Sequence, residues 1–260
     1  MQIHNLIIKI LYQKRLLLLW WFIAFVAITA LTMSFFPAFK DSGLGGSFAD
    51  LPASVQKIIG NITSFTTISG YVQQQIFALR APVLMIILSI VVFGGQVAGE
   101  EQKGVTETHL TLPISRTKLL LSKFVAGVII TSLAAMGLIA GVELGLLIIH
   151  DHYSFAHIVQ STVGAWLVGL LFGLIAFFVG AASGRKGPAL GLAGGLAFWT
   201  YLISSMAASV SWLHAINKLT PFYYYGDGLI SLAHALGLAT VCLLLMIVGT
   251  TAFNHRDLRT

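Results

Sequence analysis

The sequence predicts an all-α membrane protein with six transmembrane helices. Hydrophobic residues make up 57% of the 260 residues and charged residues only 9%, whereas a soluble domain carries about 25% charged residues. Several apolar runs reach the roughly 20 residues that a helix needs to cross a bilayer. The alternating pattern of a membrane β-barrel is absent, and a helix satisfies its own backbone hydrogen bonds in lipid.

The composition also excludes other classes of protein. The formal net charge is +6, but the basic residues are scattered between apolar spans and form no stripe that would bind nucleic acid. Cys242 is the only cysteine, so an intramolecular disulfide and a cysteine-based zinc site are excluded. The first apolar run is too long for the core of a signal peptide.

We expect a single transmembrane domain over residues 1–260. Its six predicted spans are Leu16–Phe36, Ala81–Ala98, Leu119–Ile149, Ile158–Ala182, Ala189–Val210 and Leu229–Phe253. Eleven Lys and Arg residues fall on one side of these spans and four on the other. The positive-inside rule therefore predicts a multi-pass protein of the cell membrane, bacterial, with both termini in the cytoplasm. Residues 37–79 and 211–228 would be extracellular.

Two amphipathic stretches flank the first span. Apolar residues recur at helical spacing near the N-terminus, at Ile3, Leu6, Ile7, Ile10 and Leu11. This pattern predicts an interfacial helix over residues 1–15, the alternative being an early start of the first span. A second apolar stripe over residues 51–62 predicts an outer helix that packs on the extracellular mouth.

The connection between the second and third spans holds an unusual share of the charge. It carries seven of the 24 charged residues (15 basic plus 9 acidic), namely Glu100, Glu101, Lys103, Glu107, Arg116, Lys118 and Lys123. We expect a short cytoplasmic helix from about residue 101 to 110, because Pro113 breaks a helix and Ser115 can cap the next one. Its small apolar face would hold Val105, Thr108 and Leu112.

A solvated loop that only sets the topology is the alternative for this connection. Such a loop would explain the lysines and Arg116, but not the three glutamates, since acidic residues contribute little to orientation. Mixed charge beside a small apolar face is instead typical of a docking element. A short, rigid link of this kind would let a soluble partner push on both flanking helices.

The same connection resembles the signature of the type-2 ABC transporter permeases (ABC-2 type). The resemblance is carried by Glu100, Glu101, Lys103, Gly104, Val105, Leu112, Pro113, Ile114, Ser115, Arg116 and Lys123. "LPASVQKIIGN" and "GYVQQQIFAL" resemble the family's outer segment before its second span, and "LTPFYYYGDGL" resembles its segment before the last span. Residues 106–109 depart from the Leu-rich run usual in the family, which leaves the individual docking contacts open.

The resemblance implies that residues 99–118 form a coupling segment that docks on an ATP-binding subunit. The implied docking residues are Glu100, Glu101, Lys103, Gly104, Val105, Thr108, Leu112, Pro113 and Arg116. It also implies partners: two ABC ATPase copies, the lipid bilayer, and a second permease copy or a homologous permease.

No nucleotide-binding loop is visible in the sequence. The nearest look-alike, "GAASGRKG", lacks the Ser or Thr that follows the lysine in a G-x-x-x-x-G-K-[ST] loop. We therefore expect this chain to be no enzyme and to bind no cofactor. ATP and magnesium would be held by the partner ATPase.

Glu143 lies in the third predicted span. An ionisable residue inside a membrane helix is a functional candidate, so Glu143 either serves substrate or coupling or makes a hydrogen bond inside the bundle. The nearby "HDHYSFAH" holds His150, Asp151, His152 and His157, which could bind zinc or copper. We expect a polar turn here and no metal.

Two further groups are candidates. The resemblance implies that the second and fifth spans line the pathway, so candidate pathway residues are Phe93, Glu143, Phe198, Trp199 and Met206. The fifth span also carries Gly187, Gly191, Gly194 and Gly195, which permit close helix packing. Aromatic residues before the last span are typical of an interfacial belt, and the resemblance implies a re-entrant outer gate there; both can hold. The gate residues are Pro221, Tyr223, Tyr224 and Asp227.

We expect the membrane permease subunit of an ATP-driven exporter that forms half of a translocation pathway. The expected cargo is an amphipathic drug, antimicrobial peptide or lipid, with a role in resistance. The alternative is an ion- or proton-coupled secondary transporter, which usually shows midplane ionisable residues and paired broken helices; here only Glu143 qualifies. A membrane enzyme would need paired catalytic groups within the spans, and none is visible.

Overall fold

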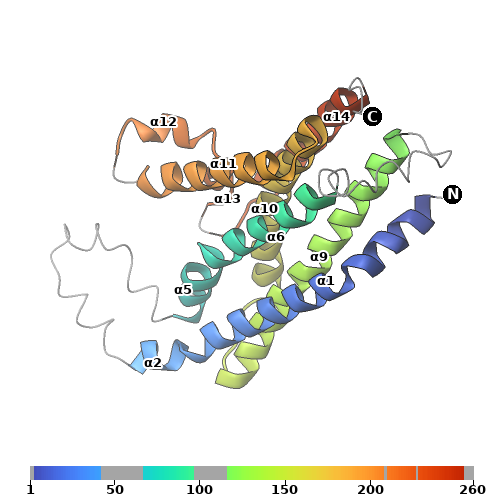
Figure 1. Ribbon diagram of the computed structural model, residues 1–260. Coiled ribbons are helices and arrows are strands. Elements are labelled where there is room, and N and C mark those ends of the chain that lie inside the picture. The colour runs from blue at the N-terminus through green and yellow to red at the C-terminus, as the bar shows by residue number, and fades with distance from the viewer. Residues whose placement is uncertain (1–2, 42–66, 97–115, 208–209, 227, 255–260) are drawn as a thin grey trace.

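The fold is a helical membrane bundle (Figure 1). The computed structural model describes residues 3–41, 67–96, 116–207, 210–226 and 228–254, and these contain helices but no strands. Six helical segments are long and apolar enough to cross a membrane: His4–Lys40, Ile68–Gln96, Thr117–Ile149, Phe155–Ser183, Lys186–Met206 and Leu232–Thr251. The predicted all-α, six-span fold is therefore confirmed.

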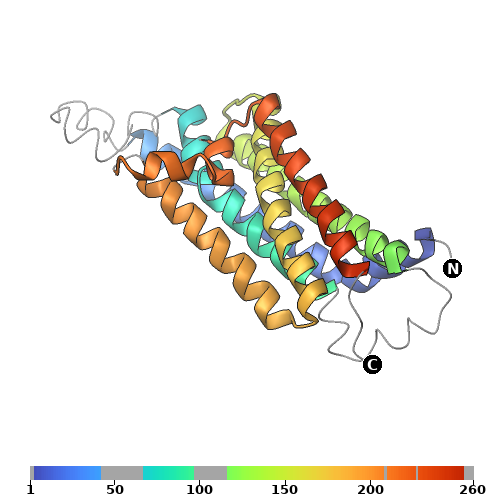
Figure 2. The same ribbon diagram turned by 90° about the horizontal axis from the view of Figure 1, so that it is seen from above.

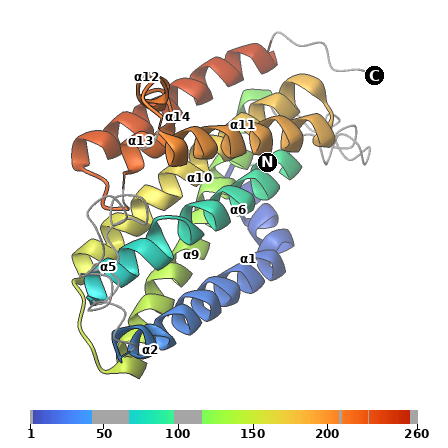
Figure 3. The same ribbon diagram turned by 90° about the vertical axis from the view of Figure 1, so that its left-hand side faces the viewer.

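The helical elements follow one another in a simple order. They are α1 (Ile3–Ser34), α2 (Phe36–Asp41), α5 (Ile68–Val72), η2 (Gln73–Phe77), α6 (Arg80–Gln96), α9 (Arg116–Ile149), α10 (Phe155–Ser183), α11 (Lys186–Met206), α12 (Leu213–Asn217), α13 (Pro221–Tyr225) and α14 (Leu232–Asn254). The central helix α10 packs against α6, α9, α11 and α14, while α1 lies along α9 (Figure 3).

The two ends of the bundle differ in what they hold. The beginning of α1 and the end of α14 lie at one end, and α2, α5 and α12 lie at the other (Figure 2). This is the grouping of termini and outer segments that the six-span prediction requires. The assignment of the first end to the cytoplasm rests on the Lys and Arg distribution and stays a prediction; we refer to the two ends as inner and outer on that basis.

The first helix differs from the predicted arrangement. α1 is continuous from Ile3 to Ser34, so residues 3–15 form no separate interfacial helix. The alternative, an early start of the first span, describes what the structure shows. No Gly or Pro interrupts this stretch, and Leu6 and Ile10 are buried against Ala126 of α9. The first turns of α1 therefore pack against α9 as part of the bundle.

The second span also begins earlier than predicted, at Ile68 instead of Ala81. The helical path runs through α5, the π-helix η2 and α6, in spite of Arg80. That charged side chain is accommodated because its guanidinium donates hydrogen bonds to the backbone carbonyl and the side chain of Gln75. Part of the segment expected to be extracellular is therefore helix, whereas the stripe over residues 51–62 lies outside the described residues.

Rows of glycines allow close contacts between helices. On α9, a Cβ atom at Gly137 would lie 2.8 Å from the carbonyl oxygen of Phe22, and one at Gly141 would lie 2.7 Å from that of Val26. Gly145 continues the row against Met33. On α10, Gly169 and Gly173 seat α6 in the same manner. Small residues four apart let two helix backbones approach closely, and here they fix α1 on α9 and α6 on α10.

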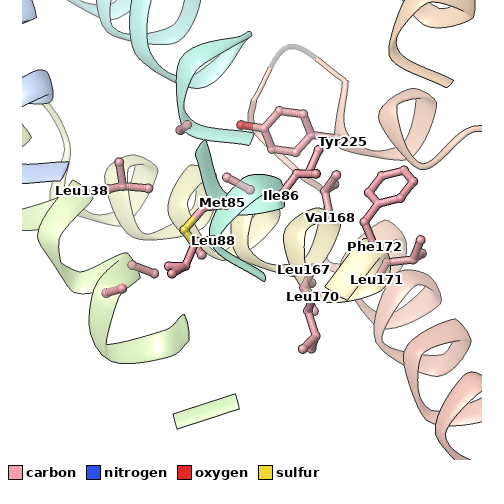
Figure 4. Packing of buried hydrophobic residues seen from close by; sticks show 14 of the residues in the cluster. Met85, Ile86, Leu88, Leu138, Leu167, Val168, Leu170, Leu171, Phe172 and Tyr225 are labelled. Carbon is pink, nitrogen blue, oxygen red and sulfur yellow. The ribbon is translucent and has the colours of Figure 1, made fainter. Parts of the chain in front are cut away.

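The apolar core lies between α6, α9 and α10. Figure 4 shows Met85, Ile86 and Leu88 of α6 beside Val168 and Leu170 of α10. This packing positions the second span, which the resemblance places at the pathway.

Candidate functional site

The inner end of the bundle is where a soluble partner is expected to dock. α6 ends at Gln96 and α9 begins at Arg116, which is where Pro113 and Ser115 predict the third span to start. The predicted docking residues from Glu100 to Pro113 lie outside the described residues. Their placement therefore stays a prediction, but the two helices that hold them are described.

Lys123 joins those two helices. Its side chain, on the second turn of α9, is only 4% exposed, and its ammonium group donates a hydrogen bond of 2.7 Å to the backbone carbonyl of Gln96. The last carbonyls of a helix have no partner within the helix, and a cation is favourable there. Lys123 therefore stabilises the end of α6 from α9, directly beside the predicted docking segment.

A shallow hollow lies at the outer end of α9. It has a volume of about 220 Å³ and is lined by Glu143, Leu146, Leu147, His150, Asp151, His152 and Tyr153. His150 ends the helix in the left-handed conformation (φ 53°), and the N–H of Asp151 donates back to the carbonyl of Leu146. This helix ending turns the polar residues 150–153 back toward Glu143.

The hollow is not arranged as a metal site. Among the described residues, no group of three or more His, Cys, Asp or Glu side chains is placed to hold a metal ion. The hollow instead combines carboxylates with leucine side chains, and the hydroxyl of Tyr153 accepts a hydrogen bond of 2.7 Å from Gln73. Such a lining suits the charged head and the apolar body of an amphipathic cation.

α11 presents two different rows of small residues. Ala189, Ala193 and Ala197 are buried against the rest of the chain. Gly187, Gly191 and Gly195 are displaced by two positions, which on a helix places them on the opposite face. A Cβ atom at any of these three glycines would meet nothing within 4 Å. This glycine row resembles the rows on α9 and α10, but no described part of the chain covers it.

The candidate pathway residues separate into two groups. Phe198 and Trp199 are each 61% exposed on α11, and Met206 is exposed near its outer end. Phe93 is instead fully buried, with its ring 5.9 Å from that of Phe177. In this conformation Phe93 belongs to the core of the single chain, whereas the α11 residues face outward.

Of the three tyrosines before the last span, one is buried in the protein and two are exposed. Pro221 begins α13, whose N-cap Thr220 accepts a hydrogen bond from the N–H of Tyr223. Tyr223 and Tyr224 are exposed, but Tyr225 is buried, and burial raises the pKa of its phenol. The remaining predicted gate residue, Asp227, lies outside the described residues. The sequence analysis named four residues of this group as the gate, but not Tyr225.

The comparison with known protein families decides the class of protein. A family model described as ABC-2 family transporter protein matches residues 53–254. The chain belongs to the ABC-2 transporter family. No match is found among curated proteins. The matched residues include five of the six spans and the segment that carries the sequence resemblance.

Membership of the ABC-2 family agrees with a permease role in membrane transport and with the six apolar helices. The inner end of the bundle, the exposed face of α11 and the residues before the last span are therefore parts of one membrane transport protein. Two features of this ABC-2 chain were missed in the sequence: the glycine row on α9 and the burial of Tyr225. The four-residue spacing of Gly137, Gly141 and Gly145 was a signal for the first, whereas three consecutive tyrosines gave no signal for the second.

Proposed function

We propose that this chain is the permease subunit of an ATP-binding cassette exporter and forms half of its translocation pathway. The observation that carries the proposal is the family match over residues 53–254. Lys123 supports it, because it holds together the two helices that flank the predicted docking segment. A partner ATPase that pushes on residues 99–118 would then move α6 and α9 together.

Co-purification tests this proposal directly. A tagged copy at native expression level, extracted in a mild detergent, should retain an ABC ATPase that mass spectrometry identifies. An ion-coupled secondary transporter is the competing function. Purification without any ATPase, together with export that follows an imposed proton gradient, would favour that competitor.

The uncovered face of α11 supports pairing with a second permease. On α9 and α10, glycine rows seat another helix, whereas no described residue covers the row of Gly187, Gly191 and Gly195. We propose that a second copy or a homologue packs here, with Phe198 and Trp199 bordering the space between the two chains. A pathway shared by two subunits would leave each chain with such an unfilled face.

Replacement of Gly191 by leucine tests the pairing. The single chain should fold normally because a Cβ atom at this position meets nothing within 4 Å. Overpacking typically costs about 1–3 kcal/mol, so we expect association of the two permeases to weaken roughly tenfold. Single-molecule photobleaching in nanodiscs measures the paired fraction. An unchanged paired fraction would show that the partner does not use this face.

The hollow at Glu143 supports an amphipathic cargo that carries a positive charge. We expect Glu143→Gln to raise the half-saturating concentration of a cationic amphiphile about fivefold, since a partly exposed ion pair contributes up to about 1 kcal/mol. Glu143→Asp keeps the charge and is the matched control. Transport by inverted vesicles measures the effect, and normal kinetics for Glu143→Gln at normal protein levels would leave Glu143 without a role in transport.

A further inference from the structure

The second span contains a break in its helical hydrogen-bond pattern. Gln73–Phe77 forms a π-helix, in which the N–H of Ala78 donates to the carbonyl of Gln73, five residues earlier. The spacing returns to that of an α-helix at Leu79, whose carbonyl accepts a hydrogen bond from the N–H of Val83, four residues later. Pro82 has no backbone N–H, so it cannot donate to the carbonyl of Ala78, four residues earlier. The carbonyl of Phe77 therefore lies where the hydrogen-bond spacing changes, between the π-turn and α6.

Tyr225 donates a hydrogen bond to this carbonyl from a distant part of the chain. Its hydroxyl donates a hydrogen bond of 2.6 Å to the carbonyl oxygen of Phe77, 148 residues away in sequence. The side chain is only 1% exposed, and its ring packs over Gly164 of α10. Figure 4 shows Tyr225 beside Ile86 and Val168, with its hydroxyl on the side of the teal ribbon of the second span.

The same segment is attached at two further points. The side-chain amide of Gln160 on α10 donates a hydrogen bond of 2.7 Å to the carbonyl of Ile230. Gly228 (φ 100°) lies against Gln73 and Phe77 so closely that a Cβ atom there would be 2.9 Å from the Cβ of Phe77. We call the described residues among 220–231 the outer segment. These contacts attach the outer segment to both the π-turn and α10.

We propose that Tyr225 is a positioning residue that latches the outer segment to the π-turn of the second span. The latch makes the outer segment and the outer part of the second span move as one unit, and opening of the outer end requires the bond between Tyr225 and Phe77 to break. π-Turns within helices occur frequently at functional sites. The statement that this opening releases cargo rests on the proposed exporter function, whereas the latch itself does not.

The test measures how often the segment opens. Ile230 is buried, so a cysteine there, in a Cys242→Ser background, should react slowly with a thiol reagent when the protein is in nanodiscs. Removing only the hydroxyl with Tyr225→Phe should raise the labelling rate about three- to tenfold, the effect expected for one lost hydrogen bond. Tyr224→Phe, which alters the exposed neighbour, should leave the labelling rate unchanged.

Labelling of the complex with its ATPase distinguishes a latch that opens during transport from a hydrogen bond that only stabilises the fold. With the co-purified ATPase present, ATP should accelerate labelling of the wild-type chain, and this acceleration should shrink in Tyr225→Phe because the segment already opens without ATP. The ATP-free comparison tests the latch even if no ATPase is found. Equal labelling of wild type and Tyr225→Phe would overturn the proposal. If Tyr225→Phe does not fold, Gln160→Met should also accelerate labelling, and no acceleration there would overturn it.

Discussion

Replacing Gly141 by leucine is expected to separate α1 from α9 and to remove most of the folded protein. A Cβ atom at this position would lie 2.7 Å from the carbonyl oxygen and 2.8 Å from the Cα of Val26. These are backbone atoms that cannot rotate aside, so the two helices must move apart. We expect a destabilisation of about 3 kcal/mol or more, the upper end for overpacking. Fluorescence-detected size-exclusion chromatography and thermal unfolding measure the loss.

Gly237→Leu is the matched control for this substitution. Gly237 lies on the exposed side of α14, and a Cβ atom there would meet nothing within 4 Å. The same gain in side-chain volume should therefore leave the unfolding temperature nearly unchanged. If Gly141→Leu elutes and unfolds like the control, the close contact between α1 and α9 does not hold the fold together.

Replacing Val105 by aspartate is expected to release the ATPase from the permease. Val105 lies on the predicted apolar face of the docking helix, outside the described residues. A new carboxylate buried without a partner against the ATPase would cost about 3 kcal/mol or more, which weakens association over a hundredfold. The variant should still insert in the membrane. ATPase co-elution and ATP-driven transport in reconstituted vesicles measure the two consequences.

Lys103→Ala is the milder comparison. A charge at the rim of an interface typically contributes under about 1 kcal/mol, whereas interface energy concentrates in a few buried positions. We therefore expect Lys103→Ala to keep most ATPase binding. If Val105→Asp keeps wild-type binding and transport, this face of the segment does not meet the ATPase.

The architecture could be predicted from the sequence because a bilayer permits few kinds of backbone structure. Apolar runs of sufficient length must be helices in lipid, and all six predicted spans are found. The charged connection carried the resemblance that the family match supports. Where α1 begins was harder to predict, because the burial of Leu6 and Ile10 depends on α9, a helix more than a hundred residues away in sequence.

The candidate site was harder to predict from the sequence, for two physical reasons. The role of Tyr225 depends on its hydrogen bond to the carbonyl of Phe77 at the end of a π-turn, and hydropathy does not detect a change in hydrogen-bond register. The two small-residue rows of α11 have the same spacing, and only the folded chain shows that the described residues cover the alanine row and leave the glycine row exposed. Sequence spacing predicts that a helix can be approached closely, but not which neighbour approaches it.

Native mass spectrometry of the complex extracted from its own membrane tests the central claim most directly. The permease of an ABC exporter with a shared pathway should appear with two ABC ATPase subunits and a second permease, either a copy of itself or a homologue. Val105→Asp should remove the ATPase subunits from that assembly, and Gly191→Leu should remove the second permease. A single chain that carries neither partner, in an extract that still exports its cargo, would contradict the account.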